Sequence, residues 1–266
     1  MVGGVMPTNL LFAASAPVLS FGGLVVGLVV GLTGMGGGAL LTPLLVIGFG
    51  VPARAAVSSD LVVSLLMKPA GAAAHHQHGS IRRDLVKWLA LGSVPAAFVG
   101  AAAVNLVARK HSEAFTERAI GIALLIAASV FLVRALRKTF AVEDQPKLRR
   151  SATLLIGVAG GFIVGATSVG SGSLMMVLLT WAYPTLAAKT LIGTDLAQAI
   201  PLVASAVLAH MFFGEIRIAL VAPLLVGAIP GAWLGGQLAH RMPDRALRPI
   251  LAVVLATSGL KLLRLL

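Results

Sequence analysis

Cysteine is absent from this sequence of 266 residues, and charged residues are scarce. The lack of thiols excludes disulfides and thiolate metal sites. Only 11% of the residues are charged, whereas soluble domains carry about 25%. The shortage of charge therefore argues against a soluble protein.

Hydrophobic residues make up 58% of the chain, and the mean hydropathy is +0.97. They form uninterrupted stretches near the ~20 residues that a bilayer-spanning helix needs. We therefore predict an all-α, polytopic membrane protein that lies in the lipid bilayer. The hydrophobic segments cover residues 10–33, 38–50, 57–77, 86–107, 116–137, 152–168, 172–187, 191–213, 217–239 and 246–265.

The formal net charge of +12 does not point to nucleic acid, because the basic residues lie between the hydrophobic segments. Arg82, Arg83, Lys87 and a basic run across 134–150 stand where cytoplasmic loops place such residues. No basic stripe with interleaved aromatic residues is present in the sequence. We expect no nucleic-acid partner and place the segment 134–150 in the cytoplasm.

Two hydrophobic segments, 38–50 and 172–187, are too short to cross a bilayer comfortably. Each follows a run rich in glycine and serine. Each glycine costs a helix about 1 kcal/mol relative to alanine, so these runs predict two helix breaks. The runs are Gly31-Leu-Thr-Gly-Met-Gly-Gly-Gly38 and Gly165-Ala-Thr-Ser-Val-Gly-Ser-Gly172.

The two breaks belong to an internal repeat. Residues 31–40 align with 165–174 at an offset of 134, and one inserted residue later the offset is 135. Chance does not align so many uncommon residues. The matched pairs include Thr33 with Thr167, Asp60 with Asp195, His75 with His210, Gly79 with Gly214, Arg82 with Arg217 and Pro95 with Pro230.

The repeat predicts two transmembrane halves, 1–137 and 151–266, joined by a polar cytoplasmic linker at 138–150. If each broken segment folds as a re-entrant hairpin, the halves are inverted, and if each crosses once, they are parallel. The basic residues fit the two arrangements almost equally well. We favour inverted repeats, each with a Gly-broken or re-entrant hairpin followed by three transmembrane helices, because short paired segments suit hairpins.

Repeats with paired interrupted helices are typical of secondary transporters, which bind substrate near the bilayer midplane where the helices are broken. The sequence therefore predicts a secondary transporter.

Two carboxylates, Asp60 and Asp195, lie in hydrophobic segments and are repeat mates. Each begins a polar stripe on one face of its helix. The carboxylates either cap the helices, with Ser59 and Thr194 beside them, or relay protons. The stripes are Asp60, Ser64, Lys68, Gly71 and His75 in the first half, and Asp195, Gln198, Ser205 and His210 in the second.

Lys68 is the one basic residue well inside a hydrophobic segment, and its repeat mate is Val203. A charge at bilayer depth costs several kcal/mol unless it is paired or hydrated. Either its side chain reaches the membrane interface, or it supplies the positive charge of an anion site, to which Arg54 would add.

The sequence contains no convincing metal or catalytic motif. His75-His76-Gln77-His78 has no adjacent carboxylate, so we interpret it as a polar interfacial turn. His75 and His210 are candidate proton carriers or helix-end anchors. Neither a Walker motif nor a nucleophile elbow is present. We predict no enzyme, no cofactor and no metal.

The run Gly31-Leu-Thr-Gly-Met-Gly-Gly-Gly-Ala-Leu-Leu-Thr-Pro-Leu-Leu45, the Ser-Ser-Asp-Leu helix and the histidine before Gly79-Ser-Ile-Arg82 resemble the sulfite exporter TauE/SafE family. The second half resembles the matching repeat in 165–174 and Gly193-Thr-Asp195. The resemblance covers nearly the whole chain from about residue 20. It implies a multi-pass transporter of the bacterial inner membrane without an ATPase subunit, which carries sulfite, organosulfonates or related anions.

We therefore expect a small anion to bind between the breaks, with a proton or sodium ion as the coupling ion. A passive anion channel, or a cation or metal transporter that uses the aspartates and histidines, is the alternative, and assembly into a homo-oligomer stays open. Asp60, Asp195, His75, His210 and Gln198 are expected to serve coupling or helix capping. The predicted substrate-binding residues are Thr33, Gly34, Met35, Gly36, Gly37, Gly38, Lys68, Thr167, Ser168, Val169, Gly170, Ser171 and Gly172.

Overall fold

The computed structural model describes residues 16–33, 37–77, 79–110, 113–136, 146–169, 172, 174–238, 256–261 and 263. These residues form helices and no strand, which confirms the all-α prediction for this part of the chain. The elements are α2 (Ala16–Thr33), η1 (Gly37–Ala39), α3 (Leu41–Pro43), η2 (Leu44–Gly48), α4 (Ala53–Gln77), α5 (Arg83–Lys110), α6 (Glu113–Leu136), α7 (Arg150–Thr167), α8 (Leu174–Ala182), α9 (Ala188–Phe213) and α10 (Ile218–Leu238).

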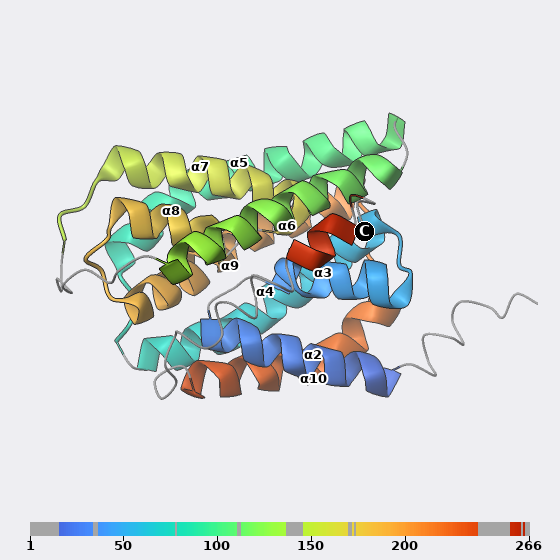
Figure 1. Cartoon of the computed structure of the whole chain (residues 1–266), viewed down its shortest axis with the longest axis horizontal. Coiled ribbons are helices and arrows are strands. Elements are labelled where there is room, and N and C mark those ends of the chain that lie inside the picture. The colour runs from blue at the N-terminus through green and yellow to red at the C-terminus, as the bar shows by residue number, and fades with distance from the viewer. Residues whose placement is uncertain are drawn as a thin grey trace, which may run out of the picture.

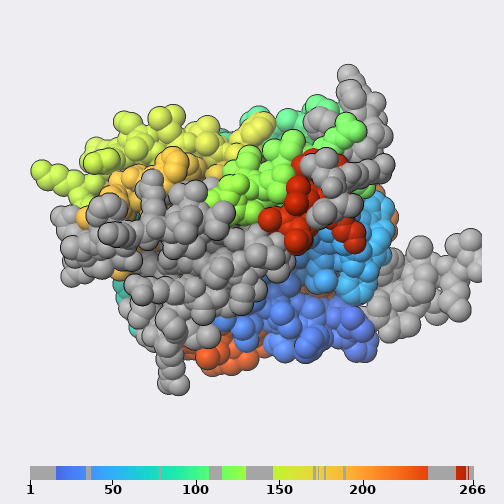
Figure 2. All heavy atoms as spheres, in the orientation of Figure 1, coloured from blue at the N-terminus to red at the C-terminus, as the bar shows by residue number. Residues whose placement is uncertain are grey.

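Among the described residues, six of the long helices form two outer pairs around a central pair, and α6 packs against α4, α7 and α8. Helices α2 and α10 lie side by side along one edge of the molecule, and α5 and α7 lie along the opposite edge (Figure 1). Between them, α4 packs against α9 and α10, and α9 packs against α5. The space-filling view shows α2 and α7 at opposite edges of the same face (Figure 2).

Each outer pair is held together by glycines that bring two backbones into contact. A Cβ at Gly27 on α2 would overlap the carbonyl oxygen of Ala228 on α10, and a Cβ at Gly161 on α7 would overlap that of Ser93 on α5. These contacts are repeat mates, since Gly27 matches Gly161 at the offset of 134 and Ser93 matches Ala228 at 135. The same correspondence holds for Gly23 with Leu224 against Gly157 with Leu89, and for Gly31 with Ala232 against Gly165 with Ala97.

The contacts also fix the directions of the helices. Residue numbers rise together along the contacts of α2 with α10 and of α7 with α5, so both outer pairs are parallel. Helix α4 is parallel to α10 too, because Gly71 lies near Ala232 and Ala74 near Gly236. Since α2 and α4 both run parallel to α10, the elements η1, α3 and η2 between them carry the chain back toward its starting side.

The central helices α4 and α9 run in opposite directions. Ser58, in the second turn of α4, lies 2.8 Å from the ring of His210 near the end of α9. A Cβ at Gly193, near the start of α9, would lie 3.2 Å from the Cβ of His75 near the end of α4. The two polar stripes are therefore carried by antiparallel neighbours.

The helices agree with the predicted hydrophobic segments, and most of the last segment, 246–265, lies outside the described residues. Both Gly-rich runs interrupt helices, as predicted: α2 ends at Thr33 and α7 at Thr167. Among the described residues, five helices are long and apolar enough to cross a membrane, which supports an integral membrane protein. They are Ala16–Thr33, Arg83–Val107, Arg150–Thr167, Thr190–Phe213 and Ile218–Leu238.

We expect Gly27→Ala to lower the free energy of unfolding by about 1–3 kcal/mol, because the added methyl group would overlap the rigid backbone of α10. Gly71→Ala is the matched control within a helix, because its Cβ would lie 3.6 Å from the flexible end of Leu196. The thermal unfolding midpoint in detergent measures the difference. Equal midpoints for the two variants would contradict the proposed role of the glycine contacts.

Candidate functional site

The two helix breaks meet in the interior. After α2 ends, the chain resumes at Gly37 in a single turn of 3₁₀-helix. After α7 ends, Ser168 takes a left-handed backbone conformation with φ 58°, and Gly172 has φ 103°. A Cβ at Gly38 would overlap the carbonyl oxygen of Ser168, so only glycine lets the first break lie against the second. A non-glycine residue in the left-handed region costs about 1–3 kcal/mol, and such positions cluster at functional sites.

The carboxylate of Asp60 lies at this meeting point and is surrounded by hydroxyl groups. Ser168 donates a short hydrogen bond to Oδ2. Thr42 donates to the same oxygen at 3.2 Å, and Ser64 donates to Oδ1 at 3.4 Å. Asp60 is 0% exposed, and a Cβ at Gly37 would lie 2.9 Å from its Oδ1. We call Asp60, Thr42, Ser64 and Ser168 the hydroxyl cluster.

Asp195 is equally buried but has a different partner. The side-chain amide of Gln198 donates to Asp195 Oδ1 at 3.1 Å. The amide oxygen of Gln198 in turn accepts a hydrogen bond from Ser93 on α5 at 3.1 Å. Asp195 and Gln198 are 1% and 0% exposed.

The interpretation of the two aspartates as helix caps is wrong. Helix α4 begins at Ala53 and α9 at Ala188, so Asp60 and Asp195 are each the eighth residue of a helix. Backbone N–H groups are already bonded within the helix at that depth, and a side chain there caps nothing.

Ser59 and Thr194, which were expected to help with capping, instead join the two halves. Ser59 Oγ accepts a hydrogen bond from the backbone N–H of Arg217, just before α10 begins, at 3.1 Å. Thr194 Oγ1 accepts one from the backbone N–H of Arg82, just before α5 begins, at 3.0 Å. The two contacts are repeat mates.

Lys68 lies two turns beyond Asp60 on α4, which continues as a helix through Pro69. Its side chain is 1% exposed and interacts electrostatically with the carboxylates of both Asp195 and Asp60. A lysine that reached the membrane interface would be exposed at its end, so that interpretation does not fit. The structure therefore brings together one ammonium and two carboxylates.

The two histidines lie at opposite ends of the central pair. His75 Nε2 is 3.4 Å from the carbonyl oxygen of Gly31, and His210 Nε2 is 3.2 Å from that of Gly165. Each imidazole thus contacts the last turn of the helix that precedes a break. Across the described residues, no group of three or more His, Asp or Glu could hold a metal ion.

The other predicted substrate-binding residues that the structure describes lie in or beside the two breaks. Thr33 donates to the carbonyl of Val29 at 2.6 Å, and Thr167 donates to that of Ile163 at 2.8 Å. The Thr167 hydroxyl also accepts a hydrogen bond from the backbone N–H of Val169, in the second break, at 3.2 Å. Val169 and Gly172 are buried beside the second break. Gly34, Met35, Gly36, Gly170 and Ser171 lie outside the described residues.

Several polar residues at the site were missed by sequence reasoning. Thr42 binds Asp60, and Ser93 supports Gln198. Ser58 and Asn105 lie 2.8 and 3.2 Å from His210 Nδ1. Thr42, Ser93 and Asn105 are each a single polar residue in an apolar stretch, and that isolation is the one signal that could have identified them. Ser58 instead adjoins Ser59 and Asp60 in the sequence.

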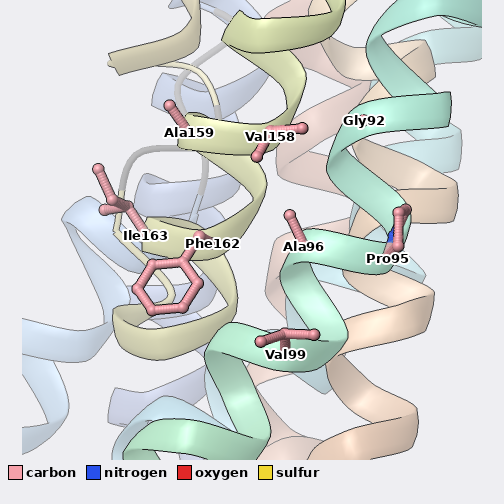
Figure 3. Close-up of a pocket in the computed structure, with 8 residues that line it drawn as sticks. All are labelled: Gly92, Pro95, Ala96, Val99, Val158, Ala159, Phe162 and Ile163. Carbon is pink, nitrogen blue, oxygen red and sulfur yellow. The ribbon is translucent and has the colours of Figure 1, made fainter.

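A groove of about 640 Å³ opens between α5 and α7, and none of these charges lines it (Figure 3). Apolar residues line it, including Val99 from α5 and Val158 and Phe162 from α7, and all three of these are exposed. A groove without polar groups does not bind a small anion, so the buried charges are the candidate site.

Comparison with known proteins finds one matching family and two similar membrane proteins. The family model described as sulfite exporter TauE/SafE matches residues 19–262. A protein of Bacillus subtilis (strain 168) named probable membrane transporter protein YjnA is 40% identical over 248 residues, which cover 91% of this chain and 97% of that protein. Another from the same organism, probable membrane transporter protein YdhB, is 23% identical over 238 residues, covering 89% of this chain and 96% of that protein. No solved structure matches the chain.

Proposed function

Because the chain belongs to the sulfite exporter TauE/SafE family of membrane transporters, we propose that it is a secondary transporter that exports small anions across the bacterial inner membrane. Sulfite and organosulfonates are the proposed substrates. The observation that carries the proposal is Lys68, a cation buried beside the meeting point of two helix breaks.

The anion binds at the ammonium of Lys68. Small anions are held by buried cations and by the N-terminal ends of helices, where backbone N–H groups are unbonded. Helix α8 begins at Leu174, directly after the second break, and directs such an end toward this region. Backbone N–H groups of the first break, at Gly37 and Gly38, complete the proposed site, whereas those of Ser168 and Val169 are bonded to Val164 and Thr167.

The two carboxylates compete with the anion for Lys68. If all three groups are ionised, they carry two negative charges and one positive charge, so an arriving anion is repelled unless a cation neutralises one carboxylate. This balance supports transport in which a proton or sodium ion accompanies the anion. Because both ions move in the same direction, export occurs when the outward driving force on the anion exceeds the inward driving force on the cation.

We also infer that the two halves are inverted repeats. The helix directions support this: α2, α4 and α10 run one way, whereas their mates α7, α9 and α5 run the other way. The return of the chain between α2 and α4 supports a re-entrant hairpin. Such an arrangement allows the site to open to either side in turn, as in other transporters built from inverted repeats.

A cation transporter is the second candidate, because two of the three buried charges are negative. Sulfite, sulfoacetate, thiosulfate, nickel and cobalt, added singly to purified protein, separate the candidates by the rise in thermal midpoint that binding produces. Stabilisation by an oxyanion is expected, and stabilisation by nickel or cobalt alone would contradict the anion proposal.

We expect Lys68→Met to reduce anion transport in proteoliposomes about tenfold or more, because a charge-assisted contact contributes about 1.5–3 kcal/mol. Lys68→Arg keeps the charge and should retain part of the activity. Lys87→Met removes an exposed lysine on α5 and is the control. Wild-type transport by Lys68→Met would refute the proposed role of this residue, and ohmic current in a planar bilayer would indicate a channel.

If the halves are inverted, the repeat mates Arg83 and Ile218, at the starts of α5 and α10, lie on opposite sides of the membrane. The chain has no cysteine, so Arg83→Cys and Ile218→Cys can be labelled without background. Both positions are exposed. With the linker 138–150 in the cytoplasm, a membrane-impermeant thiol reagent should label Ile218→Cys in intact spheroplasts and Arg83→Cys only in inside-out vesicles. Labelling of both from one side would favour parallel halves.

A further inference from the structure

The hydroxyl cluster has a composition that the binding of an anion does not explain. It places the carboxylate of Asp60 and the hydroxyls of Thr42, Ser64 and Ser168 together, and all four side chains are at most 2% exposed. Every ligand atom is an oxygen, which is what hard cations prefer. A hydroxyl that donates its hydrogen to a carboxylate keeps lone pairs that can face a cation.

The backbone around the cluster also favours positive charge. Helix α7 ends at Thr167, so its carbonyl end, which carries partial negative charge, is directed at Ser168. The carbonyl oxygen of Ser168 lies against Gly38 in the first break. In transporters with broken helices, unwound carbonyls and helix C-terminal ends coordinate sodium, while helix N-terminal ends face the anion.

The repeated fold does not require this cluster, because the mate of Asp60 lacks it. Asp195 is bonded by the N–H of Gln198, which cannot coordinate a cation. Ser64 is matched by Ala199, Ser168 by Gly34, and Thr42 by Met176 or Val177, depending on where the inserted residue falls. All three hydroxyls are thus particular to the Asp60 side.

One monovalent cation would balance the net charge of the ionised groups near the cluster. Lys68 interacts with Asp195 as well as with Asp60, so one unit of negative charge stays uncompensated among the three groups when all are ionised. A proton would satisfy this charge at a single oxygen, whereas the cluster offers several converging oxygens. That excess of oxygen ligands suits a metal cation.

We propose that the hydroxyl cluster around Asp60 is a sodium-binding site, and that the bound Na⁺ is the ion that accompanies the anion. The second part rests on the proposed anion transport, and the first part does not. Sodium at Asp60 neutralises that carboxylate. Of the two aspartates, Asp195 alone then competes with the anion for Lys68.

The first experiment uses wild-type protein in detergent. Its thermal midpoint is measured in NaCl, KCl and choline chloride at equal concentration and constant pH. We expect a saturable rise of the midpoint in NaCl above the other two salts, because a ligand of the folded state stabilises it by mass action. Equal midpoints in the three salts would overturn the sodium site.

The second experiment compares variants that remove hydroxyls at nearly constant shape. Thr42→Val and Ser64→Ala should each raise the Na⁺ concentration for half-maximal stabilisation about tenfold or more. Ser205→Ala removes a hydroxyl of α9 that binds the carbonyl of Val94 at 2.7 Å, and it should leave this concentration unchanged. If the cluster variants do not fold, the wild-type comparison of salts decides alone.

Sulfite counterflow in proteoliposomes then separates the two proposals. Transport that needs Na⁺, with a half-saturating Na⁺ concentration that rises in Ser64→Ala, supports both. Transport at full rate without Na⁺ would overturn sodium coupling and leave anion transport standing. Selective stabilisation by Na⁺ without transport of any tested anion would leave the site standing and refute the proposed function.

Discussion

Three ionisable side chains buried at the centre of a membrane protein constrain everything around them. Asp60, Lys68 and Asp195 are almost completely shielded from solvent. An isolated charge moved out of water costs several kcal/mol even after relaxation, so these groups persist only if they compensate one another or bind an ion. Two of them lie on α4 and the third on α9, and the compensation therefore depends on close contact between the two halves.

The remaining architecture supplies that contact. Glycines fix α2 against α10 and α7 against α5, and each of these pairs joins one half to the other. Ser59 and Thr194 add a hydrogen bond from each central helix to the start of an outer helix of the opposite half. Each buried carboxylate also interacts with a residue of the opposite half, Asp60 with Ser168 and Asp195 with Lys68.

The scaffold is symmetric, whereas the site is not. Glycine contacts, histidine anchors and the hydroxyls of Ser59 and Thr194 recur at the repeat offset. Lys68, Ser64 and Ser168 correspond at the repeat offset to Val203, Ala199 and Gly34. Duplication thus accounts for the helical scaffold. Residues that differ between the two halves produce one positive charge and one oxygen-rich cluster near each other.

Much of this arrangement could be predicted from the sequence. Hydrophobic length predicts the helices, glycine content predicts both breaks, and the repeat pairs Asp60 with Asp195 and His75 with His210. The predicted hydrophobic segment begins at residue 57, so Asp60 falls in its first turn, where a carboxylate can cap a helix. Pro52 immediately before Ala53 was the available start signal.

Other features depend on tertiary contacts that no local pattern encodes. Thr42 is one hydroxyl in an apolar segment, and its bond to Asp60 exists because the first break folds back onto α4. The same holds for Asn105, which reaches His210 from α5. Periodicity identifies faces of helices, but it does not identify which faces meet.

The central claim is that the anion binds Lys68 where the two breaks meet. A cryo-electron microscopy structure of the protein with bound sulfite tests it most directly. The account predicts density for the anion within hydrogen-bonding distance of Lys68 Nζ, beside 37–38 and 168–172. Sulfite found instead on the basic loops at Arg82 or Arg217, with no anion near Lys68, would contradict it.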